Sequence, residues 1–392
     1  MVNETRKDSL EKLTFFIKNG LNNYSSNRNF DFGPDNRSNV SNLSPYIRKR
    51  IVHEIEVLQE CLKFNKYENI EKFVQEVFWR TYWKGWLEGR SEIWDQYQKS
   101  TLELKQLYSQ GVRKKNYHNA LTGNTGIDCF DFWANELIEF GYLHNHARMW
   151  FASIWIHTLN LPWQLGADFF LRNLLDADPA SNTLSWRWVA GLHTQGKNYL
   201  ASENNINKFT ENRFKKKKNL SSKPLQFDYK IYDFKLNEFN ENSKTPKNSI
   251  FLINLNHLVY KDEVFNKFSN NKVCFVESFI HGETSELVKS FNKKAINDYS
   301  KTLKAKNINI DFYQNFSNFN IYLKKNNYKE IYTFYPGVGR QKDILNYFIT
   351  QNNYKLTYEY DDFDKMCWPN ASSGFFKFKK KIPFFLNEIL KN

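Results

Sequence analysis

Residues 123–190 read GNTGIDCFDFWANELIEFGYLHNHARMWFASIWIHTLNLPWQLGADFFLRNLLDADPASNTLSWRWVA, and this stretch decides the fold of the first half of the chain. Apolar and aromatic residues recur along all of it at helical spacing. Five polar side chains that an ordinary core would exclude lie among them: Asn145, Arg148, Asp176, Asp178 and Asn182. Because a buried charge is costly unless it is paired or bound, these residues indicate the lining of a ligand site.

The aromatic residues concentrate in the same part of the chain. They make up 17% of the 392 residues, and ten of the eleven tryptophans lie between Trp79 and Trp188. Tryptophan fills helical cores, but it also stacks on bases and relays electrons. With 41% hydrophobic and 25% charged residues, the composition is that of a globular protein long enough for two domains.

The net charge of +14 favours a polyanionic partner such as nucleic acid, and a Lys- and Asn-rich coding bias is the alternative explanation for part of that charge. The four cysteines form no CxxC pair, so the sequence predicts neither a disulfide framework nor a metal site. The first residues lack the apolar run of a signal peptide, and no apolar run is long enough to span a membrane. We therefore expect a cytoplasmic monomer without membrane contact.

The residues before the central stretch predict helices joined by a polar loop. Residues 9–17 form one apolar helical face, and the loop that follows ends at Leu43-Ser44-Pro45-Tyr46. Short hydroxyl and amide side chains before a helix suit a diphosphate, although most such loops are only capping turns. In the helix predicted over residues 71–89, Glu76 and Arg80 share a face. The simplest interpretation of this spacing is an ion pair between the two side chains.

From about residue 245 short apolar strands alternate with amphipathic helices, one of which has a predicted apolar face of Leu287, Phe291, Ala295, Tyr299 and Leu303. The candidate strands are residues 250–255, 273–276, 308–313, 330–334 and 356–358. This alternation predicts a parallel, doubly wound, Rossmann-like sheet, in which Gly337-Val338-Gly339 marks a turn. The fold class is therefore multidomain α and α/β. We expect an all-helical domain over residues 1–212, a basic linker over 213–245 and an α/β domain over 246–392.

Four segments of the central stretch, LHNHARM, LPWQLGADFF, LLDADPASN and WRWVAG, resemble in order and spacing the flavin-binding core of the photolyase/cryptochrome family. IFLINLNHLV and GFFKFKKKIPFFL resemble, more faintly, the first strand and the closing segment of that family's α/β domain. In ordinary members the α/β domain comes first, so this chain resembles a photolyase with permuted domain order. The resemblance implies FAD as cofactor, and it leaves open a second, antenna chromophore of unknown identity.

The resemblance also implies which residues would contact the flavin, and that Arg148 pairs with Asp176 beside its ring. Val40 stands where the family usually has a Thr, which removes one hydroxyl from the phosphate loop. Asn182 matches the position that faces flavin N5, and Trp186 and Trp163 match the inner and middle members of the family's electron-transfer chain, with Trp94 as a guess for the outer one. The cofactor-binding residues implied are Tyr24, Ser41, Asn42, Leu43, Ser44, Phe73, Arg80, Asn145, Arg148, Asp176, Asp178 and Asn182.

The implied substrate is DNA that contains pyrimidine dimers. Glu76, Trp79, Trp188, Asn145 and Met149 occupy the positions at which cyclobutane-dimer repair enzymes of the family hold the flipped-out dimer. Members that repair (6-4) lesions carry His at the positions of Asn145 and Met149, and both are absent here. Arg28 matches a phosphate contact, whereas His146 replaces an Arg that usually serves that role.

The resemblance therefore implies a carbon–carbon lyase that splits cyclobutane pyrimidine dimers with light, by electron transfer from reduced FAD. A cryptochrome-like blue-light photoreceptor without repair activity shares the flavin contacts and the tryptophan chain, so it stays an alternative. A DNA-binding protein that has lost its flavin is a third.

Overall fold

The computed structural model describes residues 5–214, 216–217, 219–239, 249–268, 271–280 and 282–391. The chain packs into two compact units, of which the first comprises Met1–Phe15, Leu43–Gly89 and Lys235–Asn392. The second unit comprises Phe16–Asn42 and Arg90–Phe234. The predicted domain limits at residues 212 and 245 stay a prediction. Lys215 and Lys218, the ends of a lysine run in the predicted linker, lie outside the described residues.

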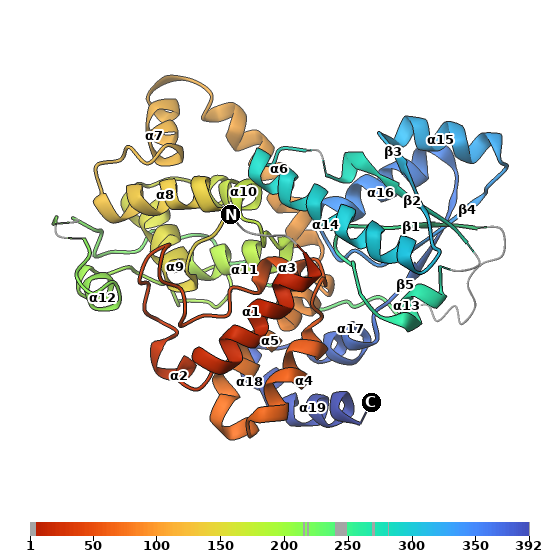
Figure 1. Ribbon diagram of the computed structural model, residues 1–392. Coiled ribbons are helices and arrows are strands. Elements are labelled where there is room, and N and C mark those ends of the chain that lie inside the picture. The colour runs from red at the N-terminus through yellow and green to blue at the C-terminus, as the bar shows by residue number, and fades with distance from the viewer. Residues whose placement is uncertain are drawn as a thin grey trace. The chain divides into compact units, whose positions relative to one another are not determined.

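The first unit contains a five-stranded sheet, in which every pair of neighbouring strands is parallel and the order is β3-β2-β1-β4-β5 (Figure 1). The central strand is buried at every position, as expected when both faces of a parallel sheet are covered. The predicted doubly wound sheet is confirmed, with strand ends shifted by at most three residues. The strands are β1 (Ser249–Leu252), β2 (Lys272–Val276), β3 (Ile310–Tyr313), β4 (Glu330–Phe334) and β5 (Lys355–Glu359).

The helices that connect these strands follow from apolar periodicity and capping. The long helix α14 begins where the Ser285 hydroxyl accepts the Val288 N–H, and its buried face includes Phe291 and Tyr299, as predicted. Residues 337–339 form the turn between β4 and the following helix, also as predicted. The connecting helices are α13 (Asp262–Asn266), α14 (Glu286–Ala305), α15 (Phe316–Lys325) and α16 (Arg340–Asn352).

The rest of the first unit is helical and combines segments from both ends of the chain. Helix α5 packs against α17 and α18, and α4 packs against α19 (Figure 1). Gly85 of α5 is required by this packing, because a Cβ there would lie 2.8 Å from the Trp368 backbone. These helices are α3 (Ser44–Arg48), α4 (Glu54–Phe64), α5 (Tyr67–Glu88), α17 (Asp362–Cys367), α18 (Phe375–Lys379) and α19 (Ile382–Leu390), and α1 (Arg6–Asn19) begins in this unit and ends in the second.

The second unit is all-helical around a core of aromatic rings. Trp133, Trp150, Trp155 and Trp186 are among its fully buried side chains. The helices of the central stretch are interrupted at Asn160, which adopts a positive φ of 53°, and before Pro179, where a new helix begins. Its helices are α2 (Tyr24–Asn27), α6 (Glu92–Leu107), α7 (Gly111–Leu121), α8 (Asp128–Phe140), α9 (Asn145–Ser153) with the π-helical turn Ile154–Thr158, α10 (Trp163–Asn173), α11 (Pro179–Val189) and α12 (Glu203–Phe209).

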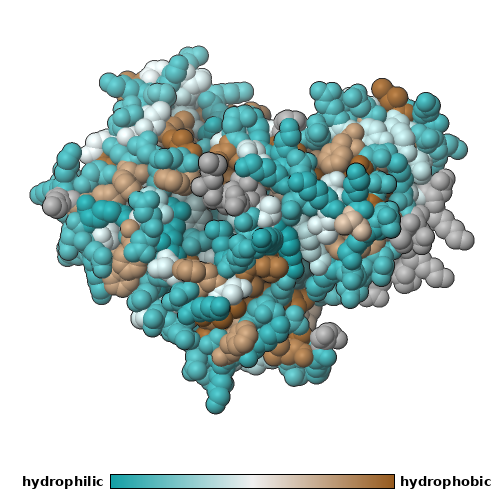
Figure 2. Space-filling model, in the orientation of Figure 1, coloured by the Kyte–Doolittle hydropathy of each residue, from teal (hydrophilic) through white to brown (hydrophobic). Residues whose placement is uncertain are grey.

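The face in Figure 2 is mostly hydrophilic, and its hydrophobic side chains gather in small separate patches. Within the described residues, no helix combines the length and the apolar character needed to cross a membrane.

Candidate functional site

An ion pair in the second unit joins α9 to the loop before α11. The Arg148 guanidinium donates to both carboxylate oxygens of Asp176, at 3.1 and 2.9 Å, and to the Leu143 carbonyl at 2.9 Å. Burial alone would lower the pKa of Arg148, but Asp176 raises it above its ordinary value, so the guanidinium stays charged. The pairing of Arg148 with Asp176 that the resemblance implies is confirmed.

Asp178, Asn182 and Trp186 follow one another along one face of α11, a turn apart. The Asp178 carboxylate accepts the Ser181 N–H at 2.8 Å and so caps the helix, a role that the sequence alone leaves open. The Asn182 side chain donates its N–H to the Ala167 carbonyl at 2.9 Å, which fixes the amide and directs its oxygen Oδ1 as the acceptor. The fully buried Trp186 indole N–H finds no hydrogen-bond partner among the described residues.

A run of aromatic rings leads from α10 to α6. Trp163 stacks on Tyr97 with centroids 5.6 Å apart, and Tyr97 lies 5.4 Å from Trp94. All three side chains are buried. The sequence analysis missed that Tyr97 lies between Trp163 and Trp94. The only sign of it in the sequence is that Tyr97 is aromatic and follows Trp94 by one helical turn.

The residues predicted to face DNA in the second unit lie at or near the surface. Asn145 is exposed at the start of α9, and Met149 is half-buried one turn later on the same face. Trp188 is half-buried and stacks on Tyr199 at 5.5 Å. Arg28, also half-buried, donates to the Ser25 carbonyl.

His146 lies next to these residues but does not replace the charge of an arginine. Its ring stacks on Trp150 at 4.0 Å, and its Nδ1 lies 3.0 Å from the Asn29 carbonyl oxygen. Burial lowers the pKa of His146, so the ring is neutral at physiological pH. His146 therefore offers no permanent positive charge to a ligand.

The predicted phosphate loop divides between the two units. In the second unit, the Tyr24 ring meets Phe16 edge-on at 5.8 Å, and the residue that follows Ser41 is Asn42, with a positive φ of 53°. The Asn42 amide donates to the carbonyls of Arg37 and Val40 and holds this turn.

In the first unit, Leu43 is buried and Ser44 opens helix α3. Arg80 of α5 donates to the Ser44 carbonyl at 3.3 Å, while its Nη1 is buried without a partner among the described residues. Phe73 is buried on the same helix, and Glu76 is exposed.

Trp79 has an aromatic neighbour that sequence reasoning missed. Its ring stacks on Phe375 of α18, with centroids 3.6 Å apart and planes 11° from parallel. Trp79 itself is half-buried. No local pattern brings together two residues so far apart in the chain, so only the aromatic character of the segment around Phe375 hinted at a contact.

Residues 73–218 match the model of the FAD binding domain of DNA photolyase. This region of the chain is similar to the FAD-binding domain of photolyases. The matched region contains the predicted flavin and dimer residues from Phe73 to Trp188, whereas Tyr24, Arg28 and the phosphate loop precede it.

Curated photolyases and a cryptochrome match part of this chain. A deoxyribodipyrimidine photo-lyase of Agrobacterium fabrum is 29% identical over 186 residues, which are 47% of this chain and 37% of that protein. Cryptochrome-1 of Arabidopsis thaliana is 37% identical over 78 residues, 20% of this chain and 12% of that protein. The solved structure of a class III photolyase from Agrobacterium tumefaciens is 26% identical with a TM-score of 0.45, and covers 53% of this chain and 43% of that one. The chain thus spans less than half the length of these relatives.

The residues present fit the flavin of a photolyase by their donor and acceptor chemistry. In the second unit, the Trp186 indole N–H is a buried donor without a partner among the described residues, and the Asn182 oxygen is an oriented acceptor. The Arg148–Asp176 pair adds a fixed donor and acceptor array. The described residues contain no cluster of His, Cys, Asp and Glu that could hold a metal ion.

Proposed function

We propose that this chain binds FAD and uses light to split cyclobutane pyrimidine dimers in DNA. The observation that carries the proposal is the Arg148–Asp176 pair, which forms together with an oriented Asn182 inside a region that matches a photolyase FAD-binding domain. The exposed Glu76 and Asn145 and the half-buried Trp79, Met149 and Trp188 support a dimer as substrate, because each remains within reach of a ligand.

The cofactor would be held by residues with separate tasks. The phosphates would be held by Tyr24, Ser41, Asn42, Leu43 and Ser44. The edge of the flavin ring and the ribityl chain would be held by Arg148, Asp176 and Asp178. The remaining contacts with the cofactor would come from Phe73, Arg80, Asn145 and Asn182. Reduced FAD, when bound, supplies the absorption of blue light and the electron that opens the dimer. An antenna chromophore would be a second ligand, to which we assign no residues.

The side chains themselves position the reactants and handle the proton. Glu76 would share a proton with a carbonyl oxygen of the dimer and so stabilise the charge that develops there. Asn182 can accept a hydrogen bond from a flavin N–H without adding charge. Trp163 and Trp186 would relay electrons to the cofactor, with Tyr97 and Trp94 as the continuing rings.

A pyrimidine dimer must leave the duplex stack before a buried cofactor can reach it. Trp79 and Trp188 would offer aromatic surfaces that stabilise the extruded dimer, and Asn145 and Met149 would lie against its edge. Arg28 and the excess of lysine behind the net charge of +14 would bind the phosphate backbone. We expect the protein to act as a monomer in the cytoplasm.

The decisive experiment is dimer repair by the FAD-loaded protein under reducing, anaerobic conditions. An oligonucleotide with one cyclobutane thymine dimer is kept in blue light or in the dark, and restored thymines are counted. We expect repair only in light, and its loss in Glu76→Ala and Trp79→Ala. Glu68→Ala is the matched control, because Glu68 is exposed on the same helix about two turns before Glu76 and is not among the predicted dimer residues.

A photoreceptor without repair activity is the second candidate, favoured by the 37% identity to Cryptochrome-1 over 78 residues. A yellow protein whose flavin is reduced by light while the dimer stays intact would overturn the repair proposal and support this one. A protein that cannot be loaded with FAD would overturn both.

A further inference from the structure

Helix α18 is fixed directly to α5, the helix that carries Glu76 and Trp79 (Figure 1). Phe375 stacks on Trp79 at 3.6 Å, and the Tyr82 hydroxyl donates to the Ser373 carbonyl at 2.9 Å. Lys379 forms an ion pair with Glu71 at 3.1 Å. With three kinds of contact to one helix, α18 keeps a fixed position at the edge of the proposed dimer site.

The outer surface of this segment is basic and partly apolar. Between residues 365 and 387 the chain has five lysines and no acidic residue. Lys377, Lys380 and Lys381 are exposed, and the side chain of Phe376 is 83% exposed. Lysines gathered around an exposed ring are typical of surfaces that bind nucleic acid, where the charges meet phosphates and the ring meets sugar or base.

We propose that α18 and the lysines that follow it bind the phosphates of the DNA strand next to the extruded dimer. This inference rests on the proposed repair function. DNA is the expected ligand for two reasons. The surface is basic, and it is connected through Phe375 to Trp79, the proposed wall of the dimer site. The segment would supply backbone affinity that the neutral His146 does not. Such contacts position the protein on DNA without reading sequence or damage.

The test compares two double variants by DNA binding. Lys377→Ala/Lys380→Ala removes two exposed lysines of the proposed contact, and Lys324→Ala/Lys325→Ala removes two exposed lysines of α15 as the control. Labelled duplexes with and without one thymine dimer are titrated with each protein across a range of salt concentrations. Because all four lysines are exposed, neither variant is expected to disturb folding.

We expect the first variant to bind both duplexes about tenfold more weakly at moderate salt. The slope of its log affinity against log salt should decrease in magnitude by about 1.8, because each lost phosphate contact removes about 0.9. The control should keep the slope of the unaltered protein.

Equal slopes for both variants, in a protein that repairs dimers, would overturn this inference alone. Loss of binding to vesicles of anionic phospholipid by the first variant, with an unchanged DNA slope, would assign the surface to membranes and would also overturn it. A reduced slope in a protein that repairs no dimer would support the DNA contact while the proposed repair function fails.

Discussion

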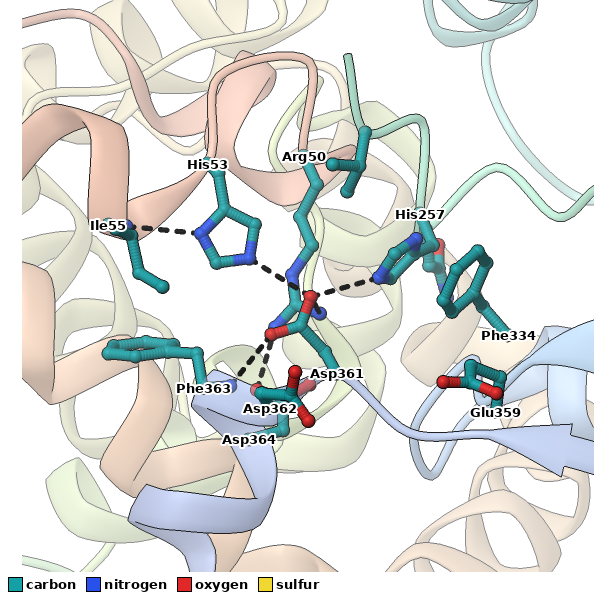
Figure 3. A network of polar contacts seen from close by, with 12 residues as sticks. Arg50, His53, Ile55, His257, Phe334, Glu359, Asp361, Asp362, Phe363 and Asp364 are labelled. Carbon is teal, nitrogen blue, oxygen red and sulfur yellow. Dashed lines mark hydrogen bonds and ion pairs between the residues drawn. The ribbon is translucent and has the colours of Figure 1, made fainter. Parts of the chain in front are cut away.

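Asp361→Asn should destabilise the first unit by about 3 kcal/mol, because breaking a buried ion pair typically costs about 3–5 kcal/mol. Asp361 follows strand β5, and one of its oxygens receives three donors (Figure 3). Arg50 Nη1 lies 3.0 Å from it, and the Nε2 atoms of His53 and His257 each lie 3.1 Å from it. The other oxygen accepts the Phe363 N–H at 2.9 Å and caps α17.

The protonation states in this network follow from its geometry. The Nδ1 of His53 accepts the Ile55 N–H at 3.1 Å, so its Nε2 carries the hydrogen that faces Asp361. Burial alone would raise the pKa of Asp361, but Arg50 and the two histidines hold it well below its ordinary value. Asp361 is therefore ionised and accepts at both oxygens.

An asparagine cannot reproduce this arrangement. Its amide has one acceptor oxygen and one donor nitrogen, so either the three donors or the Phe363 N–H would face another donor. Arg50 would keep Asp364, at 2.7 Å, and this partner places the expected loss at the lower end of the range. Arg50 also adopts a positive φ of 54°, a strained backbone conformation that its ion pairs hold in place.

The assay is urea unfolding followed by far-UV circular dichroism, with amide hydrogen exchange over residues 49–64 to report on the first unit. Asp362→Asn is the matched control, since its carboxylate is 93% exposed and pairs only with Lys365 among the contacts described, at 2.7 Å. We expect the control to change the free energy of unfolding by less than about 0.5 kcal/mol. If Asp361→Asn changed it no more than the control, the reasoning from buried ion pairs would be refuted.

Three further predictions concern packing, electron transfer and pH. Gly166→Ala should destabilise the second unit by about 1–3 kcal/mol and alter its near-UV circular dichroism, because the new Cβ would lie 2.3 Å from the Trp186 ring; Gly374→Ala, with open space around it, is the neutral control. Tyr97→Leu should slow light-driven reduction of bound FAD severalfold by interrupting the ring-to-ring contacts, whereas reduction by dithionite in the dark should not change. Burial lowers the pKa of His257 from 6.5 to about 4, so between these pH values only the unfolded chain binds a proton at this ring. The free energy of unfolding should therefore fall by up to about 3 kcal/mol as the pH falls through this range. His257→Gln should flatten this part of a plot of urea midpoint against pH, and an unchanged plot would contradict the prediction.

Local periodicity predicted the regular elements, because it records which face of each element is buried. The five parallel strands and the long helix with Phe291 and Tyr299 on its buried face were found in this way. The Arg148–Asp176 pair was found through resemblance, since nothing in the spacing of two residues 28 positions apart identifies them as partners.

Contacts between distant parts of the chain could not be predicted. Arg50 and Asp364 are 314 positions apart, and neither belongs to a motif that points to the other. The sequence presented Phe375 only as part of a faintly familiar segment, so its stacking on Trp79 and its link to the basic surface of α18 came from the structure.

These long-range contacts change how the domains of this chain should be understood. A domain boundary drawn from sequence separates the helices before residue 212 from the sheet after residue 246, as if each part folded alone. In the structure, residues 43–89 share one compact unit with the sheet and with α17, α18 and α19. Because Glu76 and Trp79 lie on α5 within that unit, the order of the proposed dimer site depends on the C-terminal helices that pack against it. The helices α17 and α18, rather than a linker in the middle of the chain, thus contact the helix that carries the proposed acid.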